Sequence, residues 1–137
     1  MSIEYLPPVA AVEVTRPDTV QIVYNLVRRA AEDRFFPAAR AANVGVIARE
    51  PLANGFLAGK YRQDSIWEKG DIRGRMPRPY VAQLAALGTR VAELAGAAGV
   101  SAAQLALRFV LDNDAVSVVI VGMKTVAQVD ENLSVET

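Results

Sequence analysis

One stretch, residues 44–61, most limits the folds open to this chain. It begins with a short apolar run, residues 44–48, followed by a polar turn and a Pro/Gly-rich segment. A short apolar run that is bounded by turn residues and flanked by helical patterns predicts a buried strand of a parallel sheet. The polar turn at residues 49–51 then stands where an α/β protein places its ligand-binding loop.

Two further segments predict strands, because each is rich in β-branched residues. They are residues 19–24 and residues 116–121. Between and after the three strands, apolar residues recur at helical spacing. The predicted helices cover residues 36–42, 79–98, 102–111 and 126–133, whereas residues 9–14 fit either a short strand or a helical turn.

Local signals mark the ends of these helices. Pro37 is expected in the first turn of its helix, because a proline in a helix interior costs about 3 kcal/mol. Asn43 and Gly99 stand where C-terminal capping residues are expected. Ser101 and Gln104 form a capping-box pattern at the start of the next helix.

The resulting order is strand, helix, strand, long loop with helices, strand and helix. That order predicts an α/β fold with parallel strands. No linker divides residues 1–137, so one domain is expected. The polar segment at residues 61–79 is too long for a plain connector, which favours a functional loop, a lid or a mobile segment.

The composition excludes several classes of function. Hydrophobic residues make up 52% of the chain, as in globular proteins, and Lys+Arg balance Asp+Glu at 15 each, so no nucleic-acid surface is expected. The absence of histidine and cysteine removes Ser-His-Asp triads, thiol chemistry and most zinc sites, and we predict no metal site. Without an apolar run of membrane-spanning length or a signal pattern, we expect no membrane and a cytoplasmic location.

Five motifs occur in one order along the chain. They are VQIVYN at residues 20–25, AREPLANGFLAGKY at 48–61, DIRGR at 71–75, SAAQLALRFVL at 101–111 and VSVVIVGMKTVAQVDENL at 116–133. In sequence and order they resemble the aldo-keto reductases, but only the sixth, seventh and eighth βα units of that family's TIM barrel. The resemblance therefore implies a truncated, partial TIM barrel of about three βα units with extra helices.

The resemblance also implies that the catalytic centre is missing. The family's tetrad of Asp, Tyr, Lys and His belongs to the part of the barrel that has no counterpart here, and the chain has no histidine. No residue present matches a tetrad position. We therefore predict no catalytic residue and at most very weak reduction of aldehydes, unless a replacement acid such as Tyr24 or Lys60 acts.

What the resemblance does carry over is contact with NADP. Gln21 matches the glutamine that binds the nicotinamide carboxamide, and Arg49 matches the residue that packs on the nicotinamide ring. Leu52 and Asn54 match positions along the pyrophosphate. A structural alternative stays open in each case: a strand glutamine satisfied by backbone groups, a solvated charge at a strand end, and ordinary loop packing.

The adenosine end of the nucleotide has the strongest physical basis. TIM barrels commonly bind phosphate with the loops after the last strands and the start of a short helix, where free N–H groups favour an anion. The resemblance implies that Lys124 contacts the 2′-phosphate of NADP and that two amide side chains contact adenine; the alternative is an ordinary helix capped by Thr125. The predicted residues are Gly122, Met123, Lys124, Thr125, Gln128 and Asn132.

A partial barrel leaves two strands without a neighbour. Both outer strands would present an unpaired edge, and Val116, Val118 and Ile120 would face an empty barrel interior, so we expect a homo-oligomer. Two functions remain open. One is an NADP(H)-related oxidoreductase of the aldo-keto reductase kind that lacks the tetrad and has a weak or relic nucleotide site. The alternative is a non-catalytic oligomeric half-barrel without cofactor binding.

Overall fold

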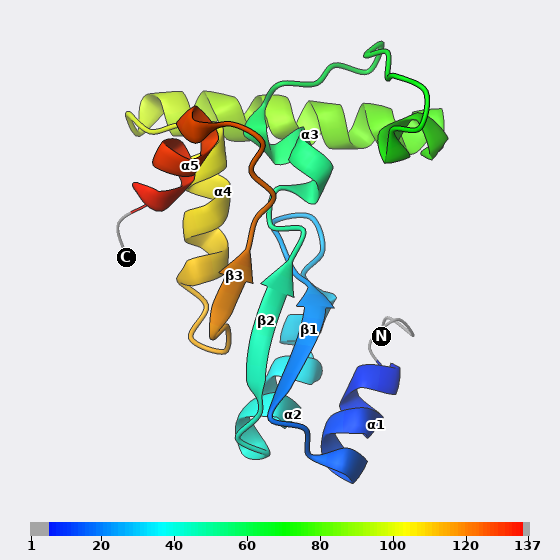
Figure 1. Ribbon diagram of the computed structural model, residues 1–137, viewed down its shortest axis with the longest axis vertical. Helices are drawn as coiled ribbons and strands as arrows, with labels where there is room; N and C mark the ends of the chain where they lie inside the picture. The colour runs from blue at the N-terminus through cyan, green and yellow to red at the C-terminus, as the bar shows by residue number, and fades with distance from the viewer. Residues whose placement is uncertain (1–5, 136–137) are drawn as a thin grey trace. The chain divides into compact units, whose positions relative to one another are not determined.

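The computed structural model of the protein describes residues 6–135 (Figure 1). The described residues form two compact units. The first consists of residues 6–51 and 109–122, and the second of residues 52–108 and 123–135. The expected single domain of residues 1–137 stays a prediction.

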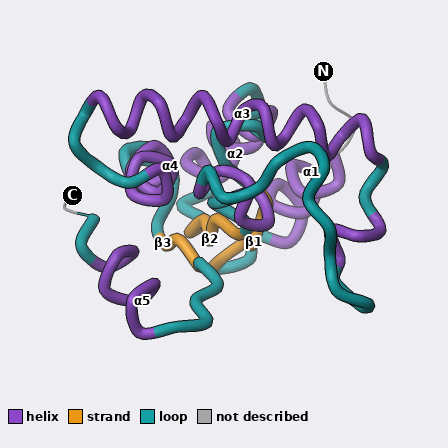
Figure 2. Tube along the Cα trace, turned by 90° about the horizontal axis from the view of Figure 1, so that it is seen from above, coloured by secondary structure: helices purple, strands orange, loops and turns teal. Residues whose placement is uncertain are grey.

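The first unit contains a parallel sheet of three strands in the order β1-β2-β3. The strands, which lie side by side in Figures 1 and 2, are β1 (Thr19–Val23), β2 (Gly45–Arg49) and β3 (Val118–Ile120). The predicted α/β fold with parallel strands is therefore confirmed.

The third strand is shorter than the predicted residues 116–121. Val116 precedes it, because the Val116 N–H donates to the Asn113 carbonyl, 2.9 Å away, in a turn. The Ser117 N–H then bonds to Val46 O at 2.9 Å, so pairing with β2 begins one residue before the strand. The other two predicted strands agree with β1 and β2 to within one residue at each end.

Helices cover one face of this sheet. α1 (Leu6–Thr15) packs on α2 (Phe35–Ala41), which lies behind the strands in Figure 1. Residues 9–14 are thus helical rather than extended, and Val9 and Val12 are buried in the core. A short 3₁₀ helix, η2 (Ala30–Glu32), precedes α2.

α2 begins and ends close to the predicted residues. Pro37 lies in its first turn, as expected, where the missing N–H costs no helical hydrogen bond. The C-cap is Ala42 rather than Asn43. Asn43 is the next residue and adopts the left-handed conformation with φ 56°, which asparagine tolerates better than most residues.

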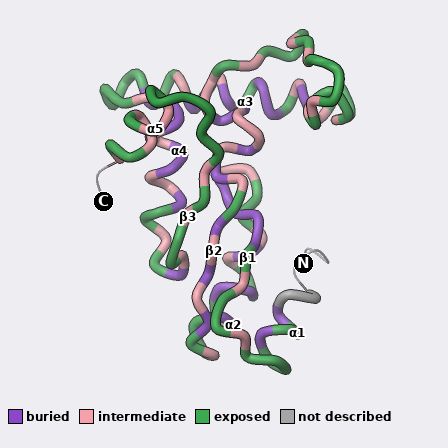
Figure 3. Tube along the Cα trace, viewed as in Figure 1, coloured by how far each residue is buried: buried purple, intermediate pink, exposed green. Residues whose placement is uncertain are grey.

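The core of the first unit lies between the sheet and these helices. Tyr24, just after β1, packs edge to face on Phe36 with ring centroids 4.8 Å apart and stacks on Phe109 at 5.7 Å. Val46 and Ala48 point the same way from β2 and are fully buried. Figure 3 shows the buried segments of the chain in purple. Burial of these side chains is the main driving force for forming this layer.

The opposite face of the sheet is open within the first unit. The strand register places Gln21, Ile47 and Val118 in one row across it. Val118 is 49% exposed and Ile120, on the same face, is 44% exposed. The prediction that Val116 faces an empty barrel interior was wrong, because this residue packs against the core.

The second unit is mostly helical. It contains α3 (Arg78–Ala97), most of α4 (Ala102–Leu111), α5 (Val126–Leu133) and two 3₁₀ helices, η3 (Ala53–Ala58) and η4 (Ile72–Arg75). The predicted helix ends are confirmed: Gly99 has φ 72°, Ser101 and Gln104 exchange both bonds of a capping box, and Thr125 Oγ1 accepts from Gln128 N–H at 3.2 Å.

η3 packs closely on α3, and a glycine makes that contact feasible. A Cβ atom added at Gly88, in the middle of α3, would lie 2.1 Å from the carbonyl oxygen of Phe56 in η3. Only a residue without a side chain therefore allows this backbone approach. Phe56 and Leu57, the buried side chains of η3, fill the space against the helix.

Hydropathy adds one observation on these helices. Across residues 6–135 no single helix is both long and apolar enough to cross a membrane. α3 and α4 reach the required length and composition only when counted together, as a pair bent by more than 40°.

Gly88→Ala should destabilise the protein by about 2 kcal/mol or more, because the new methyl group must displace the Phe56 backbone. Gly96→Ala is the matched control, since Gly96 lies in the same helix with nothing within 4 Å of an added Cβ. It should stabilise the helix by about 0.5 kcal/mol. Urea unfolding of both variants measures the difference, and equal stabilities would contradict the close approach.

Candidate functional site

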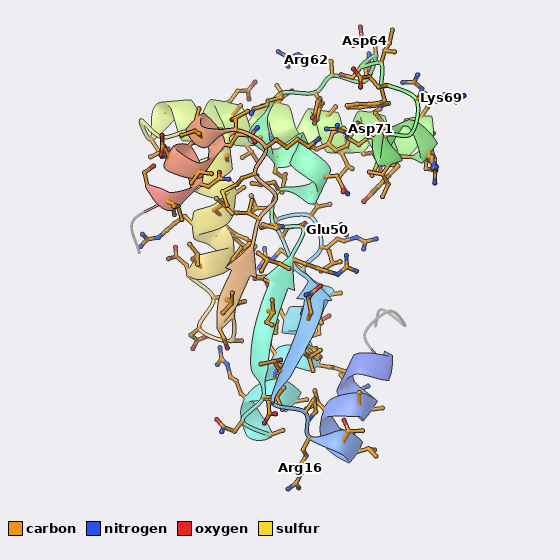
Figure 4. The ribbon with its side chains drawn as sticks, viewed as in Figure 1. Arg16, Glu50, Arg62, Asp64, Lys69 and Asp71 are labelled. Atoms are coloured by element: carbon orange, nitrogen blue, oxygen red, sulfur yellow. The ribbon has the colours of Figure 1, made fainter. Side chains whose placement is uncertain are left out.

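The turn that follows β2 is held by one buried side chain. Asn25, only 1% exposed, donates from Nδ2 to Glu50 O at 2.9 Å. Glu50 has a left-handed backbone with φ 56°, which costs free energy for a non-glycine residue. The Asn25 bond fixes that strained peptide at the carboxyl end of β2, where Figure 4 labels Glu50.

The same side chain organises the turn after β1. Asn25 Oδ1 accepts from the N–H groups of Val27 and Arg28, both at 2.9 Å. One asparagine thus ties together the two turns that follow neighbouring strands. These three hydrogen bonds of the buried amide make both turns more rigid than an apolar residue of equal size could.

A second buried network surrounds Tyr24, which is 1% exposed. Its hydroxyl donates to Glu32 Oε1 at 2.7 Å and accepts from Asn113 Nδ2 at 2.9 Å. Burial, with the Glu32 hydrogen bond as the next cause, raises the pKa of Tyr24 from 10.0 to about 12. A bidentate pair with Arg29 in turn holds the pKa of Glu32 below its ordinary value.

This network excludes Tyr24 as the replacement acid that the sequence left open. Its ring points into the core between Phe36 and Phe109, away from the open face of the sheet. With a pKa raised from 10.0 to about 12, the hydroxyl also releases its proton less readily than an ordinary tyrosine does. Tyr24 is therefore a structural residue.

The two residues predicted to contact nicotinamide lie on the open face of the sheet. Gln21 of β1 is paired in register with Ile47 of β2, and Arg49 lies two residues after Ile47 on β2. The side chains of Gln21 and Arg49 therefore project from the same face of the sheet. Both are exposed, and Arg49 Nη1 contacts Glu50 Oε1 at 2.5 Å. The first unit thus brings these two residues together.

The residues predicted to line the pyrophosphate belong to the second unit. Leu52 and Asn54 are half-buried at the start of η3, and Leu52 O accepts from the N–H groups of Gly55 (2.9 Å) and Leu57 (3.1 Å). Asn54 and Gly55 both have left-handed backbones, with φ 57° and 89°. The segment is a tight turn that turns its backbone sharply just after β2.

The predicted adenosine-phosphate residues form the exposed start of α5. Thr125 caps the helix, and Gln128 Oε1 accepts from the Lys124 N–H at 2.7 Å. Among residues 6–135 the Lys124 side chain makes no ion pair. Gly122 has open space around it, Met123 is exposed and Asn132 is half-buried.

The start of α5 suits a phosphate group, although one of its backbone N–H groups already has a hydrogen-bond partner. The uncompensated ammonium group and the helix start suit an anion. The Lys124 N–H, however, is already bound by Gln128. Gln128 therefore acts first as a capping residue, and an adenine contact would use its remaining amide group.

The sequence patterns missed a cluster in the second unit. Arg73 lies over the rings of Tyr61 and Trp67, with its Cζ atom 4.5 and 4.6 Å from their centroids, and forms a bidentate pair with Asp71. Burial lowers the pKa of the Arg73 guanidinium from its ordinary value, which still leaves it charged. The DIRGR motif was the available signal, but its partner Trp67 lies outside the motif.

Comparison with known proteins identifies the family of this chain. A sequence model of the aldo/keto reductase family matches residues 2–137. The chain belongs to this family. It is 33% identical over 115 residues to YrpG, an oxidoreductase of Bacillus subtilis, and 28% identical over 128 residues to the aldo-keto reductase yakc [NADP(+)] of Schizosaccharomyces pombe.

A solved aldo-keto reductase structure has the same arrangement. The glycerol dehydrogenase AKR11B4 from Gluconobacter oxydans superposes with a TM-score of 0.77 and 30% identity over 98% of this chain. The structural match covers 41% of that chain. The match to YrpG covers 84% of this chain and 34% of YrpG, and the match to yakc covers 91% of this chain and 36% of yakc. The chain thus spans about a third of the curated relatives, and its three parallel strands are part of a TIM-barrel fold.

Tyr24→Phe tests the buried network by its pH dependence. Because the folded pKa of Tyr24 lies above the unfolded value of 10.0, its stabilising contribution is full below about pH 10 and is lost as the pH rises toward 12. Wild type should lose about 2–3 kcal/mol of stability over that range through this group.

The variant should be less stable than wild type by about 1–2 kcal/mol at neutral pH, since Glu32 and Asn113 each lose a partner. Denaturant unfolding between about pH 9 and pH 12 compares the two proteins. A stability difference that stays constant over this range would contradict the buried hydroxyl.

Proposed function

We propose that this chain binds NADP(H) weakly, mainly through the adenosine-phosphate end, as the nucleotide-binding part of an aldo-keto reductase. The observation that supports this proposal is the start of α5. There a capped helix, a lysine without an ion pair among the described residues and an open glycine follow the last strand. Family membership supports this assignment, and the relative yakc has NADP(+) in its name.

The two ends of the nucleotide have unequal support in this chain. Residues 122–125 and the two amides of α5 are contiguous in sequence, so the adenosine site needs no other strand. The two residues predicted to contact nicotinamide, Gln21 and Arg49, lie on the open face of the first unit, where Val118 and Ile120 remain exposed. Affinity should therefore depend more on the 2′-phosphate than on the nicotinamide ring.

When bound, NADPH would supply the hydride for reduction of a carbonyl group. This chain's residues bind and orient the nucleotide, but the described residues of the first unit, which carries the open sheet face, include no lysine or histidine and one tyrosine, Tyr24. Histidine is absent from the sequence, and Tyr24 is buried in the core. We propose that the chain contributes nucleotide contacts and no catalytic residue.

A second proposal concerns the open face of the sheet. Exposed Val118 and Ile120 lie opposite Ile47 and Arg49 of β2 and form an apolar surface that a monomer would leave in water. The outer edges of β1 and β3 are also unpaired among the described residues. We propose that a second copy of the chain covers this surface, so that the non-catalytic oligomeric half-barrel remains the alternative function.

Lys124→Ala tests nucleotide binding. It removes one charge-assisted contact, worth about 1.5–3 kcal/mol if well formed, so affinity for 2′,5′-ADP should fall at least about tenfold. Lys69→Ala is the control, because Lys69 is also an exposed lysine of the second unit. Calorimetric titration measures both, and equal affinities, or no heat with wild type, would favour the alternative function.

Sedimentation tests the oligomer. Wild type at micromolar concentration should sediment as a dimer or larger species, because burial of the open face is favourable. Val118→Asp should shift the population toward monomer, because the new carboxylate would be desolvated at the contact. Glu68→Asp, at an exposed loop position, serves as the control. A wild-type protein that sediments as a single monomeric species would disprove this proposal.

A further inference from the structure

The loop between η3 and α3 is fixed by a charged side chain placed inside an aromatic cluster. We define the aromatic box as Phe56, Tyr61 and Trp67, whose rings meet pairwise edge to face with centroids 4.7–5.9 Å apart. Arg73 occupies the corner between Tyr61 and Trp67. Its side chain is 16% exposed, and its guanidinium is therefore largely removed from water.

Every nitrogen of the Arg73 guanidinium has a partner. Nε donates to Asp71 Oδ1 at 2.9 Å and Nη2 donates to Asp71 Oδ2 at 2.5 Å, which gives the two-pronged geometry that only arginine offers. Nη1 contacts the Tyr61 hydroxyl. Asp71 also accepts from the Arg73 backbone N–H at 2.9 Å and so caps η4.

The aromatic box reaches back to the turn at Asn54 and Gly55. Phe56 follows that turn directly and is 1% exposed. A Cβ atom added at Gly55 would lie 3.1 Å from Tyr61 Cε2 and 3.8 Å from Arg73 Nη1. The left-handed pair is therefore packed against the box, and movement of Tyr61 would remove its support.

We propose that Arg73 is a positioning residue: through the aromatic box it holds the turn at Asn54 and Gly55 in the shape offered to the nucleotide pyrophosphate. This inference rests on the proposed function, because the pyrophosphate assignment of that turn does. Arg73 acts through Tyr61 and Phe56, since its donors are already committed to Asp71 and Tyr61. The long loop is thereby a preformed support for the turn.

Trp67, the sole tryptophan of the chain, reports directly on the box. Its Nε1 atom is buried without a hydrogen-bond partner among the described residues, so its emission should respond to any opening toward water. Arg73→Ala should make Trp67 more accessible to acrylamide quenching. Arg75→Ala is the matched control, because it removes an exposed arginine of the same loop and should leave quenching unchanged.

Nucleotide binding then separates positioning from direct contact. In Arg73→Ala the affinity for NADPH should fall about tenfold, whereas adenosine 2′-monophosphate, which has no pyrophosphate, should bind as to wild type. Arg73→Lys should behave like Arg73→Ala, because an ammonium group lacks the planar fork. A lysine variant with wild-type NADPH affinity would indicate a simple charge contact and overturn the proposal.

Asp71→Asn is a second variant for the case that Arg73→Ala fails to fold. It removes the charged partner of Arg73 but keeps the cation–π contacts, so Trp67 quenching and NADPH affinity should change in the same direction by a smaller amount. Unchanged quenching in both variants would overturn the positioning role. Wild type that does not bind NADPH would refute the proposed function and with it the pyrophosphate role, whereas altered quenching in Arg73→Ala would still show that Arg73 holds the aromatic box.

Discussion

β2 is the constraint on which the first unit depends. Both other strands of the sheet pair with it and not with each other, so every inter-strand bond has one partner on this five-residue segment. Its inward residues, Val46 and Ala48, are fully buried, and its last residue passes directly into the strained Glu50 turn. The central strand thus determines both where the core lies and where the loop that follows it begins. Asn25 extends this control to the neighbouring strand, because it fixes the two turns at the same edge of the sheet.

The sequence predicted this framework well because its signals are local. Capping residues such as Ser101, Gln104 and Thr125 act within one helical turn, and the apolar run of β2 needs only its own composition to be recognised. The strand prediction failed where a turn and core packing override β propensity. Val116 has the β-branched side chain of a strand residue, yet the Asn113 carbonyl binds its N–H in a turn and its side chain packs into the core.

The candidate site was predictable to a lesser extent, and for a physical reason. A family motif can name Lys124 or Gln128, but it cannot show that the Gln128 side chain already bonds to the Lys124 N–H. Similarly, Gln21 and Arg49 could be placed on one sheet face only once the register of β1 and β2 was known. Contacts within the long loop, such as Arg73 with Trp67, depend on a loop path that no periodicity encodes.

These contacts explain how a mainly polar loop can remain ordered. The segment between η3 and α3 has few apolar residues of its own, and Ile66 and Ile72 are exposed rather than buried. Its order must therefore come from a few concentrated interactions. The Arg73 guanidinium supplies them by combining cation–π contact with two rings and a bidentate carboxylate bond, each of which strengthens away from water. The cost of desolvating that charge is offset only while Asp71 and both rings stay in place, so the loop and the turn beneath it should order or disorder together.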